Sequence, residues 1–385
     1  MYYFDQAATS LKKPKVVADA VYEALTSDTI GNPGRGGHRA SIAGSRIVYE
    51  TRIAIAELLG ATHYDVVLTK NVTEALNVAI KGVFQPVDHV ITTILEHNSV
   101  LRPLYELEAD GMELDFVDCK PGTGTLMYDQ FETLLRPETQ AVVMTHASNV
   151  TGEVVDLKRV SDFCQKHGLL LIVDGAQTTG LIDINLDELG VDIFCFTGHK
   201  SLYGPQGTGG MCVKKGVEVR SFLSGGSGAN TFSKEQPQQM PERLEAGTPN
   251  AHSLAGLRAG IQYVMEQNPA KLFNHVHQLT TTFYEAVSQM EHVHVYSEKP
   301  NLHSGVVALN VKGLDSAEVS EWLDEEHDVF VRSGSHCAPL LHEHFGTKDQ
   351  GMVRFSFSSF NTVEEVEYAI KALKELSNHG QSRSI

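Results

Sequence analysis

An aspartate and a lysine, Asp174 and Lys200, lie 26 residues apart, and each follows a short apolar run. Asp174 comes directly after Leu169–Val173, and Lys200 closes a Thr-Gly-His-Lys segment that follows residues 192–196. Runs of this kind predict buried strands, and parallel strands end at the same edge of a sheet. The carboxylate and the amine are therefore expected to lie close enough to hold the two ends of one aromatic ring.

A pyridine ring that carries an aldehyde needs this pair of residues. The carboxylate keeps the ring nitrogen protonated, and the lysine forms a Schiff base with the aldehyde. Taken singly, Asp174 is more often a turn residue at a strand end, and Lys200 a solvated loop residue. Together, and with His199 beside the lysine, they predict pyridoxal phosphate as the cofactor.

Further polar residues, Thr73, His97 and Asn149, also follow apolar runs. Thr73 lies near the start of an expected helix, where backbone N–H groups can hold a phosphate. His97 could stack on a ring and move protons near neutral pH. Each has an ordinary alternative, as a helix-capping or turn residue. Their common position favours one site beyond the carboxyl ends of the strands.

Only one of the five cysteines, Cys337, lies in a polar loop, which spans Arg332–Pro339. Arg332 and His336 could lower the pKa of its thiol and expose a thiolate. The others end a strand or fall on apolar patterns that indicate core positions: Cys119, Cys164, Cys195 and Cys212. A metal site from His336, Cys337, His342 and His344 is an alternative, but the irregular spacing disfavours it, and no metal is predicted.

Arg354 is a single charge within the apolar alternation of residues 351–356. An arginine in such a strand needs a carboxylate partner. That partner is either an internal aspartate or glutamate, or the carboxylate of a substrate.

Short apolar runs alternate with helical patterns from about residue 65. The expected strands are Asp65–Thr69, His89–Thr93, Leu114–Val117, Ala141–Thr145, Leu169–Val173 and Ile193–Thr197, and the expected helices are Thr73–Val83, Ser99–Ala109 and Leu157–His167. This order predicts an α/β fold with a mostly parallel sheet covered on both faces. A long helical stretch, Leu254–Gln289, then leads into a smaller α/β unit with strands at His292–Tyr296, Gly305–Asn310, Val329–Arg332 and Met352–Ser356.

These patterns divide the chain into three parts. Residues 1–12 are expected to pack with the smaller domain, residues 13–254 to form the large domain, and residues 255–385 to form the small C-terminal domain.

Composition excludes several kinds of partner. The chain has 385 residues, 42% of them hydrophobic, and a formal net charge of -17, which argues against nucleic acid and anionic membranes. No apolar run is long enough for a transmembrane helix, and no signal peptide is evident. An odd, scattered set of cysteines favours a reducing cytoplasm.

A series of short motifs, taken together, resembles one known family. They are Phe4–Thr9, Thr73–Ala75, Glu96–Asn98, Ser148–Gly152, Val173–Gln177, Gly198–Lys200, Glu245–Asn250, Arg332–Ala338 and Val353–Ser356. The ordered set resembles the class V aminotransferase-fold enzymes, specifically cysteine desulfurases and selenocysteine lyases of the second, short-loop group. The resemblance implies fold type I, with a large domain built on a mostly parallel mixed sheet, a smaller C-terminal α/β domain and an obligate homodimer.

The resemblance also implies roles toward the cofactor. Lys200 would form the Schiff base, Asp174 would pair with the pyridinium nitrogen, and Gln177 would contact the phenolic oxygen. His97 would stack on the ring and relay a proton. The phosphate would be held by Thr73, Thr197 and His199, and by Thr248 of the other subunit.

Toward the substrate, the resemblance implies that Arg354 and Asn149 bind the carboxylate, with Asn149 also facing the cofactor. Arg35 and His38 would line the entrance, and Cys337 would accept the sulfur. The implied reaction converts L-cysteine to L-alanine and leaves a persulfide on Cys337, from which an acceptor protein, unidentified by the sequence, would take the sulfur.

Other activities remain open on the same scaffold: selenocysteine lysis, epimerisation or transamination. A non-enzymatic alternative is an idle scaffold for sulfur-transfer partners, which the presence of Lys200, Asp174 and His97 disfavours. The sequence departs from common family patterns at Ser335, Val72 and Gln6. These departures bear on the sulfur acceptor and the preferred substrate rather than on the cofactor.

Overall fold

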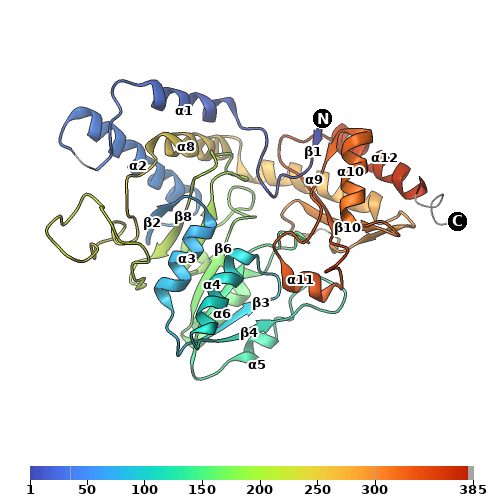
Figure 1. Cartoon of the computed structure of the whole chain (residues 1–385), viewed down its shortest axis with the longest axis horizontal. Helices are drawn as coiled ribbons and strands as arrows, with labels where there is room; N and C mark the ends of the chain where they lie inside the picture. Colours follow the sequence, from blue (N-terminus) through green and yellow to red (C-terminus); the bar gives the residue numbers. More distant parts are fainter. Residues whose placement is uncertain (35, 300, 380–385) are drawn as a thin grey trace.

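The structure, a computed structural model, describes residues 1–34, 36–299 and 301–379. The described residues form three β-sheets, of seven, three and two strands, and the two larger ones organise the chain. Figure 1 shows the larger sheet and its helices, mostly blue to green, beside the smaller sheet with its orange and red helices. The predicted α/β fold with a mostly parallel mixed sheet is confirmed.

The seven-stranded sheet is parallel except at one strand. Its order is β2-β8-β7-β6-β5-β3-β4, and β8 runs antiparallel to both β2 and β7. The strands are β2 (Tyr64–Thr69), β3 (His89–Thr93), β4 (Glu113–Val117), β5 (Thr139–Thr145), β6 (Leu170–Asp174), β7 (Ile193–Thr197) and β8 (Gly209–Lys214). The parallel strands coincide with the predicted apolar runs, because strands covered on both faces have little room for polar side chains.

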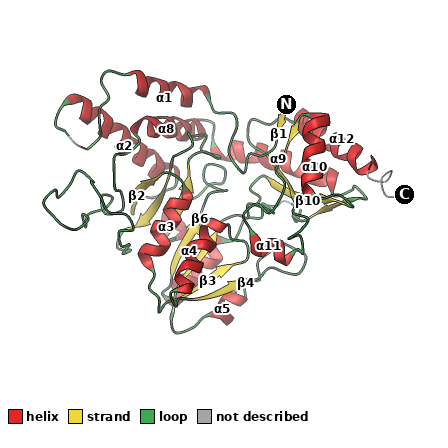
Figure 2. Ribbon diagram, viewed as in Figure 1, coloured by secondary structure: helices red, strands yellow, loops and turns green. Residues whose placement is uncertain are grey.

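Helices cover both faces of this sheet (Figure 2). Along β5, Val142 and Met144 enter one apolar core, whereas Ala141 and Val143 enter the other. The second core also contains α3 (Val72–Val83) and α4 (Asn98–Ala109). The first contains residues of α1 (Lys15–Thr26), α2 (Arg39–Leu58), α5 (Gln130–Leu134), α6 (Leu157–His167), α7 (Leu186–Leu189) and α8 (Ala251–Glu266).

The three-stranded sheet is antiparallel, with the order β12-β10-β9. It shares an apolar core with three helices, α9, α10 and α12. The elements of this part are α9 (Pro269–Val287), β9 (Val293–Val295), β10 (Val306–Val311), α10 (Ser316–His327), β11 (Val329–Phe330), α11 (Pro339–His344), β12 (Val353–Ser356) and α12 (Val363–His379). None of the described helices is both long and apolar enough to cross a membrane.

The N-terminal segment belongs to this smaller core. β1 (Tyr2–Tyr3) pairs in parallel with β11, and the fully buried Phe4 places its ring 6.0 Å from that of Phe355. The first and last parts of the sequence therefore pack together, as Figure 1 shows for β1 and α10.

The helical stretch predicted as continuous from Leu254 to Gln289 is two helices, α8 and α9. Asn268 has a φ of 66° and accepts the Ala270 N–H to cap α9, and Pro269 takes the first helical position. The apolar spacing continues across this break, so periodicity alone did not reveal it. α8 packs on α1 and α2 of the large-sheet region, whereas α9 packs on α12 and β10 of the smaller one. The chain therefore passes from one packing region to the other between α8 and α9. The predicted domain boundaries stay predictions.

Glu245 fixes the segment that carries Thr248. Its two carboxylate oxygens accept from Nη1 and Nη2 of Arg52, each at 2.7 Å, and Oε1 also accepts the Leu68 N–H at 2.6 Å. Arg52 lies in α2 and Leu68 in β2, so one carboxylate ties this loop to two elements of the large sheet region.

Glu245→Ala should lower the apparent free energy of unfolding by roughly 2 kcal/mol, because the part-buried Arg52 guanidinium loses its carboxylate partner and the Leu68 N–H loses its acceptor. Urea denaturation followed by circular dichroism measures the loss. The exposed Glu235 lies in the same connecting segment, and Glu235→Ala should change stability by less than about 0.5 kcal/mol. Equal unfolding midpoints for the two variants would contradict the role of Glu245.

Candidate active site

Most of the predicted site residues line one cavity of about 250 Å³, called here the Lys200 cavity. It lies where β5, β6 and β7 end and where α3 and α4 begin. The predicted residues in its lining are Lys200, Asp174, Gln177, His97, Thr73, Thr197, His199, Asn149 and Arg354. The position agrees with the rule that α/β sheets bind ligands beyond the carboxyl ends of their strands.

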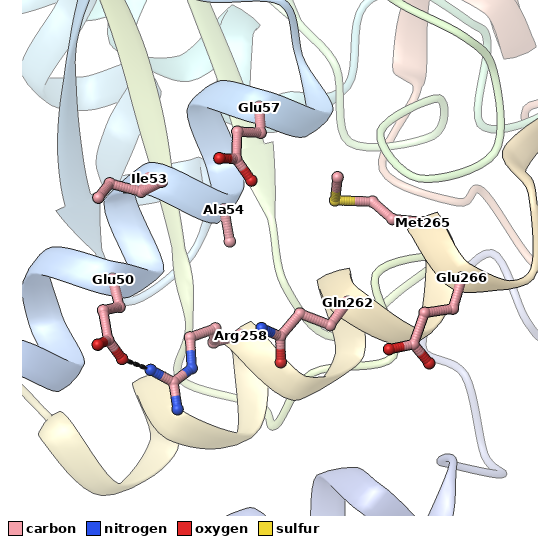
Figure 3. Close-up of a pocket in the computed structure, with 8 residues that line it drawn as sticks. All are labelled: Glu50, Ile53, Ala54, Glu57, Arg258, Gln262, Met265 and Glu266. Carbon is pink, nitrogen blue, oxygen red and sulfur yellow. Dashed lines mark hydrogen bonds and ion pairs between the residues drawn. The ribbon is translucent and has the colours of Figure 1, made fainter.

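A larger hollow of about 560 Å³ lies between α2 and α8. Figure 3 shows its lining, which includes the ion pair of Glu50 with Arg258 and the side chains of Ile53 and Met265. Its described lining contains no lysine, histidine or cysteine. The titratable side chains of this hollow are glutamates and one arginine, so it lacks the amine and the imidazoles of the Lys200 cavity.

Asp174 and Lys200 carry opposite charges in the same cavity. Burial raises the pKa of Asp174, while the Ala176 N–H, which donates to Oδ1 at 2.9 Å, and the charge of Lys200 oppose that rise. Burial lowers the pKa of Lys200 to about 8, although Asp174 raises it. Near neutral pH the amine is therefore unprotonated far more often than that of an ordinary lysine, and the unprotonated amine is the nucleophile.

His97 begins α4 and is neutral at physiological pH. Its Nδ1 accepts the Ser99 N–H at 3.0 Å, so in the neutral ring the proton lies on Nε2. Burial, followed by the charge of Lys200, lowers its pKa to about 4. The preceding residue, the fully buried Glu96, accepts the Thr145 N–H at 3.0 Å and so ties this loop to the end of β5.

One end of the cavity has the features of a phosphate site. The first turn of α3 lines it through Asn71, Val72 and Thr73, and the leading N–H groups of a helix have no partner within the helix. The Thr73 and Ser99 hydroxyls lie 2.7 Å apart. The Thr197 hydroxyl is buried and has no hydrogen-bond partner among the described residues, as expected of a group that awaits a ligand.

Another part of the lining is cationic. Arg354, in β12, is fully buried; its Nη2 donates to Asp5 at 2.7 Å and its Nη1 to the Asn149 carbonyl at 3.0 Å. Arg332 also lines the cavity. The sequence left open whether the partner of Arg354 is internal or a substrate, and the structure supplies an internal one, Asp5.

The loop with Cys337 lies at the cavity. His336 and Cys337 have φ values of 49° and 55°, and His336 lines the cavity while Cys337 is exposed. The Cys337 carbonyl accepts the N–H of Asn98, directly after His97, at 2.7 Å. Asn149 donates to the His336 carbonyl at 2.8 Å. The loop is thus tied to both sides of the cavity, and its cysteine faces solvent.

The remaining cysteines are buried, and burial raises the pKa of each: Cys119, Cys164, Cys195 and Cys212. In the described residues no group of three or more histidine, cysteine, aspartate or glutamate side chains could hold a metal ion. The His336 and His342 rings stack 5.8 Å apart, but His344 pairs instead with Asp118. The alternative metal site on this loop has no support in this geometry.

Several predicted residues do not line the Lys200 cavity. His38 is exposed and caps α2 by accepting the Ser41 N–H. Thr248 lines a separate hollow with Lys70 and Glu74, and Asn71 lines both spaces. Arg35 lies outside the described residues. The predicted roles of all three concern an entrance or a second subunit, and they stay predictions.

Sequence reasoning missed some of the lining. Arg332, Ala7 and Ala8 belong to motifs that carry the family resemblance, but none of them was predicted to line the site, and all three line the cavity. Ser99 and Thr145 were also missed. A signal was available for the alanines, because small residues between Asp5 and Thr9 allow the backbone to approach a ligand closely.

Comparisons with known proteins identify the family of the chain. The family model described as aminotransferase class-V matches residues 2–369. A probable cysteine desulfurase from Pyrococcus abyssi is 32% identical over 386 residues, covering 97% of this chain and 94% of the relative.

Two solved structures extend the comparison. The apo structure of a cysteine desulfurase from Thermococcus onnurineus NA1 has a TM-score of 0.91 and 32% identity, and covers 98% of this chain and 95% of that one. The cysteine desulfurase CsdA (S-sulfonic acid) from Escherichia coli has a TM-score of 0.86 and 26% identity, with 97% and 94% covered. With its fold, its lysine and aspartate at the strand ends and these matches, the chain belongs to the class V aminotransferase family.

Proposed function

We propose that this protein is a pyridoxal-phosphate-dependent cysteine desulfurase, which converts L-cysteine to L-alanine and leaves the sulfur on Cys337 as a persulfide. The observation that carries the proposal is the position of Cys337. It is exposed, it follows the cavity-lining His336, and its carbonyl binds the start of α4 beside His97. The similarity to proteins named cysteine desulfurases supports the assignment.

The residues of the cavity fit pyridoxal phosphate. The buried Asp174 carboxylate suits a protonated ring nitrogen, and the Lys200 amine suits the aldehyde. The α3 N-terminus and the unpartnered Thr197 hydroxyl suit the phosphate. When bound, the cofactor supplies an aldehyde that condenses with amines and a ring that withdraws electrons from the neighbouring carbon.

The protein groups would divide the remaining work. Arg354 would hold the substrate carboxylate, and Lys200, with a pKa of about 8, is suited to exchange a proton with Cα near neutral pH. Neutral His97 would offer its Nε2–H beside the ring, where it can hold or donate a proton.

In the sulfur-transfer step, the Cys337 thiolate forms a bond to the sulfur of the substrate, and the Cβ–S bond breaks. The electron pair left on Cβ takes up a proton. The net change converts L-cysteine and a cysteine thiol to L-alanine and a cysteine persulfide, so no external oxidant or reductant is consumed. Because Cys337 is exposed, a protein acceptor could then reach this sulfur.

A homodimer in the cytoplasm completes the proposal. Large apolar side chains are exposed on α1 and α2: Tyr22 (69%), Leu25 (61%), Ile42 (51%) and Tyr49 (65%). α1 and α2 both pack on α8, and exposed apolar side chains on two such helices favour a subunit interface. No cysteine among the described residues forms a disulfide, which agrees with a reducing compartment.

Lys200→Ala should abolish the visible absorption band of the bound cofactor and any adduct trapped by borohydride. In the unaltered protein stripped of cofactor, adduct formation should speed up as pH rises towards about 8 and then level off, because only the unprotonated amine attacks. Lys15→Ala, which changes an exposed lysine, is the control. Peptide mapping that places the adduct on another lysine would overturn the assignment.

Cys337→Ser should retain cofactor binding but lose nearly all alanine production from L-cysteine, because an alcohol is a far poorer nucleophile toward sulfur. Mass spectrometry after a single turnover should find one extra sulfur on the Cys337 peptide of the unaltered enzyme. Ser335→Ala, in the same loop, should keep that modification. A persulfide on Cys119, or full activity in the serine variant, would refute the proposed acceptor.

Mixing Thr248→Ala with Lys200→Ala subunits should restore activity if Thr248 serves the cofactor site of the other subunit, because one site of the mixed dimer is then intact. A homodimer of either variant alone should have reduced activity. Tagged subunits allow the mixed dimer to be purified and its turnover measured. A purified mixed dimer without activity would show that the sites are not shared in this way.

A further inference from the structure

Asp5 is the carboxylate that pairs with the buried Arg354. Its Oδ1 lies 2.7 Å from Nη2, and the arginine side chain is 2% exposed, against 21% for the aspartate. A buried guanidinium without a counter-charge is costly. Arg332 and Lys200, which line the same cavity, add positive charge rather than compensate it. Asp5 therefore has an electrostatic role before any substrate is present.

The backbone on both sides of Asp5 is bonded to the strand that carries Arg354. The Phe4 carbonyl accepts the Ser356 N–H at 2.6 Å, and the Ala7 N–H donates to the Ser356 hydroxyl at 2.9 Å. Asp5 itself forms a parallel bridge with Ser356. The backbone around Asp5 and the strand that carries Arg354 are thus held in one short register, which keeps the carboxylate within reach of the guanidinium.

The guanidinium keeps unused hydrogen-bond donors. Arginine has five N–H groups, and the described contacts are one from Nη2 to Asp5 and one from Nη1 to the Asn149 carbonyl. Its Nε is buried without a hydrogen-bond partner in the described residues. Two contacts therefore fix the plane of the guanidinium, and donors remain for a planar, bidentate anion.

We propose that Asp5 is a positioning residue for substrate recognition: it holds the Arg354 guanidinium in the orientation that binds the carboxylate of the amino-acid substrate, and does not contact the substrate itself. This inference rests on the proposed function in requiring an amino-acid substrate, although it does not depend on which amino acid reacts. Asp5 would act through Arg354 alone.

The opposite role, in which Asp5 occupies the place of the substrate carboxylate and must leave, does not suit this geometry. The backbone bonds on either side of Asp5 hold its main chain beside the strand that carries Arg354, so the segment itself does not move away. The unused N–H groups of Arg354 also give a second carboxylate a place without displacement. The two roles predict opposite changes in affinity, so they can be separated by experiment.

The test compares Asp5→Ala and Asp5→Asn with the unaltered holoenzyme. Binding of L-alanine, the expected product, is followed by spectral titration, and KM and kcat are measured with L-cysteine. Asp5→Ala should weaken L-alanine binding and raise KM on the order of tenfold, with kcat changed by less than about threefold, since a hydrogen bond to a charged group is lost. Asp5→Asn keeps an oxygen acceptor, so it should retain the fold and show a smaller loss.

A ligand without a carboxylate and a double variant give the controls. Binding of cysteamine should be unaffected by either substitution, because this amine has no carboxylate for Arg354 to recognise. In an Arg354→Ala background, Asp5→Ala should cause no further loss of L-alanine binding. Asp19→Asn, which changes an exposed aspartate paired with Lys15, should behave as the unaltered enzyme.

Tighter L-alanine binding in the Asp5 variants would overturn the proposal in favour of competition, and unchanged binding would overturn it outright. Equal losses for L-alanine and cysteamine would also overturn it, because the effect would then not concern the carboxylate. If the unaltered holoenzyme bound neither L-alanine nor L-cysteine, the proposed function would fail as well.

Discussion

The placement of Asp174 and Lys200 in one cavity is the constraint on which the site depends. Burial disfavours the charged form of each group: it raises the pKa of the aspartate and lowers that of the lysine to about 8. The charge of Lys200 lowers the pKa of Asp174, and the charge of Asp174 raises the pKa of Lys200, so each partly opposes the effect of burial on the other. Both side chains must therefore leave neighbouring strands at the same edge, which a parallel order of β6 and β7 provides. An antiparallel neighbour would place one of them at the opposite end of the sheet.

The surrounding structure brings other groups to this edge. His97 and Thr73 begin helices that follow strands of the same sheet, so their caps and free N–H groups face the cavity. Arg354 and Cys337 come instead from the C-terminal part of the chain. The N-terminal segment connects the two parts, because Asp5 binds Arg354 while the Ser10 N–H and the Lys13 ammonium donate to the carbonyl of His199, the residue before Lys200. The short segment from Asp5 to Lys13 thus links Arg354 to the loop that carries Lys200.

Much of the larger sheet and its site could be predicted from local patterns. Residues such as Asp174 and Thr197 end apolar runs whose alternate side chains enter two cores, and a run of that kind has few alternatives to a buried parallel strand. The break between α8 and α9 could not be predicted from spacing, because apolar residues continue on both sides of Asn268 and only its positive φ and the following proline separate the helices. An internal carboxylate was one of the two partners expected for Arg354, but its identity could not be predicted, since Asp5 lies 349 residues away in the sequence.

The sequence by itself determined the strand-forming runs, the polar residue that follows each, and the one cysteine in a polar loop. These are local properties, set by side-chain type and by the few residues on either side. Tertiary structure alone decided which residues share the cavity: it placed Arg332, Ala7 and Ala8 in the lining, and gave Arg354 a carboxylate before any substrate arrives. The physical reason is that strand order, β1–β11 pairing and buried ion pairs depend on contacts between distant segments. Those contacts join residues that lie far apart in the sequence, so no local pattern reports them.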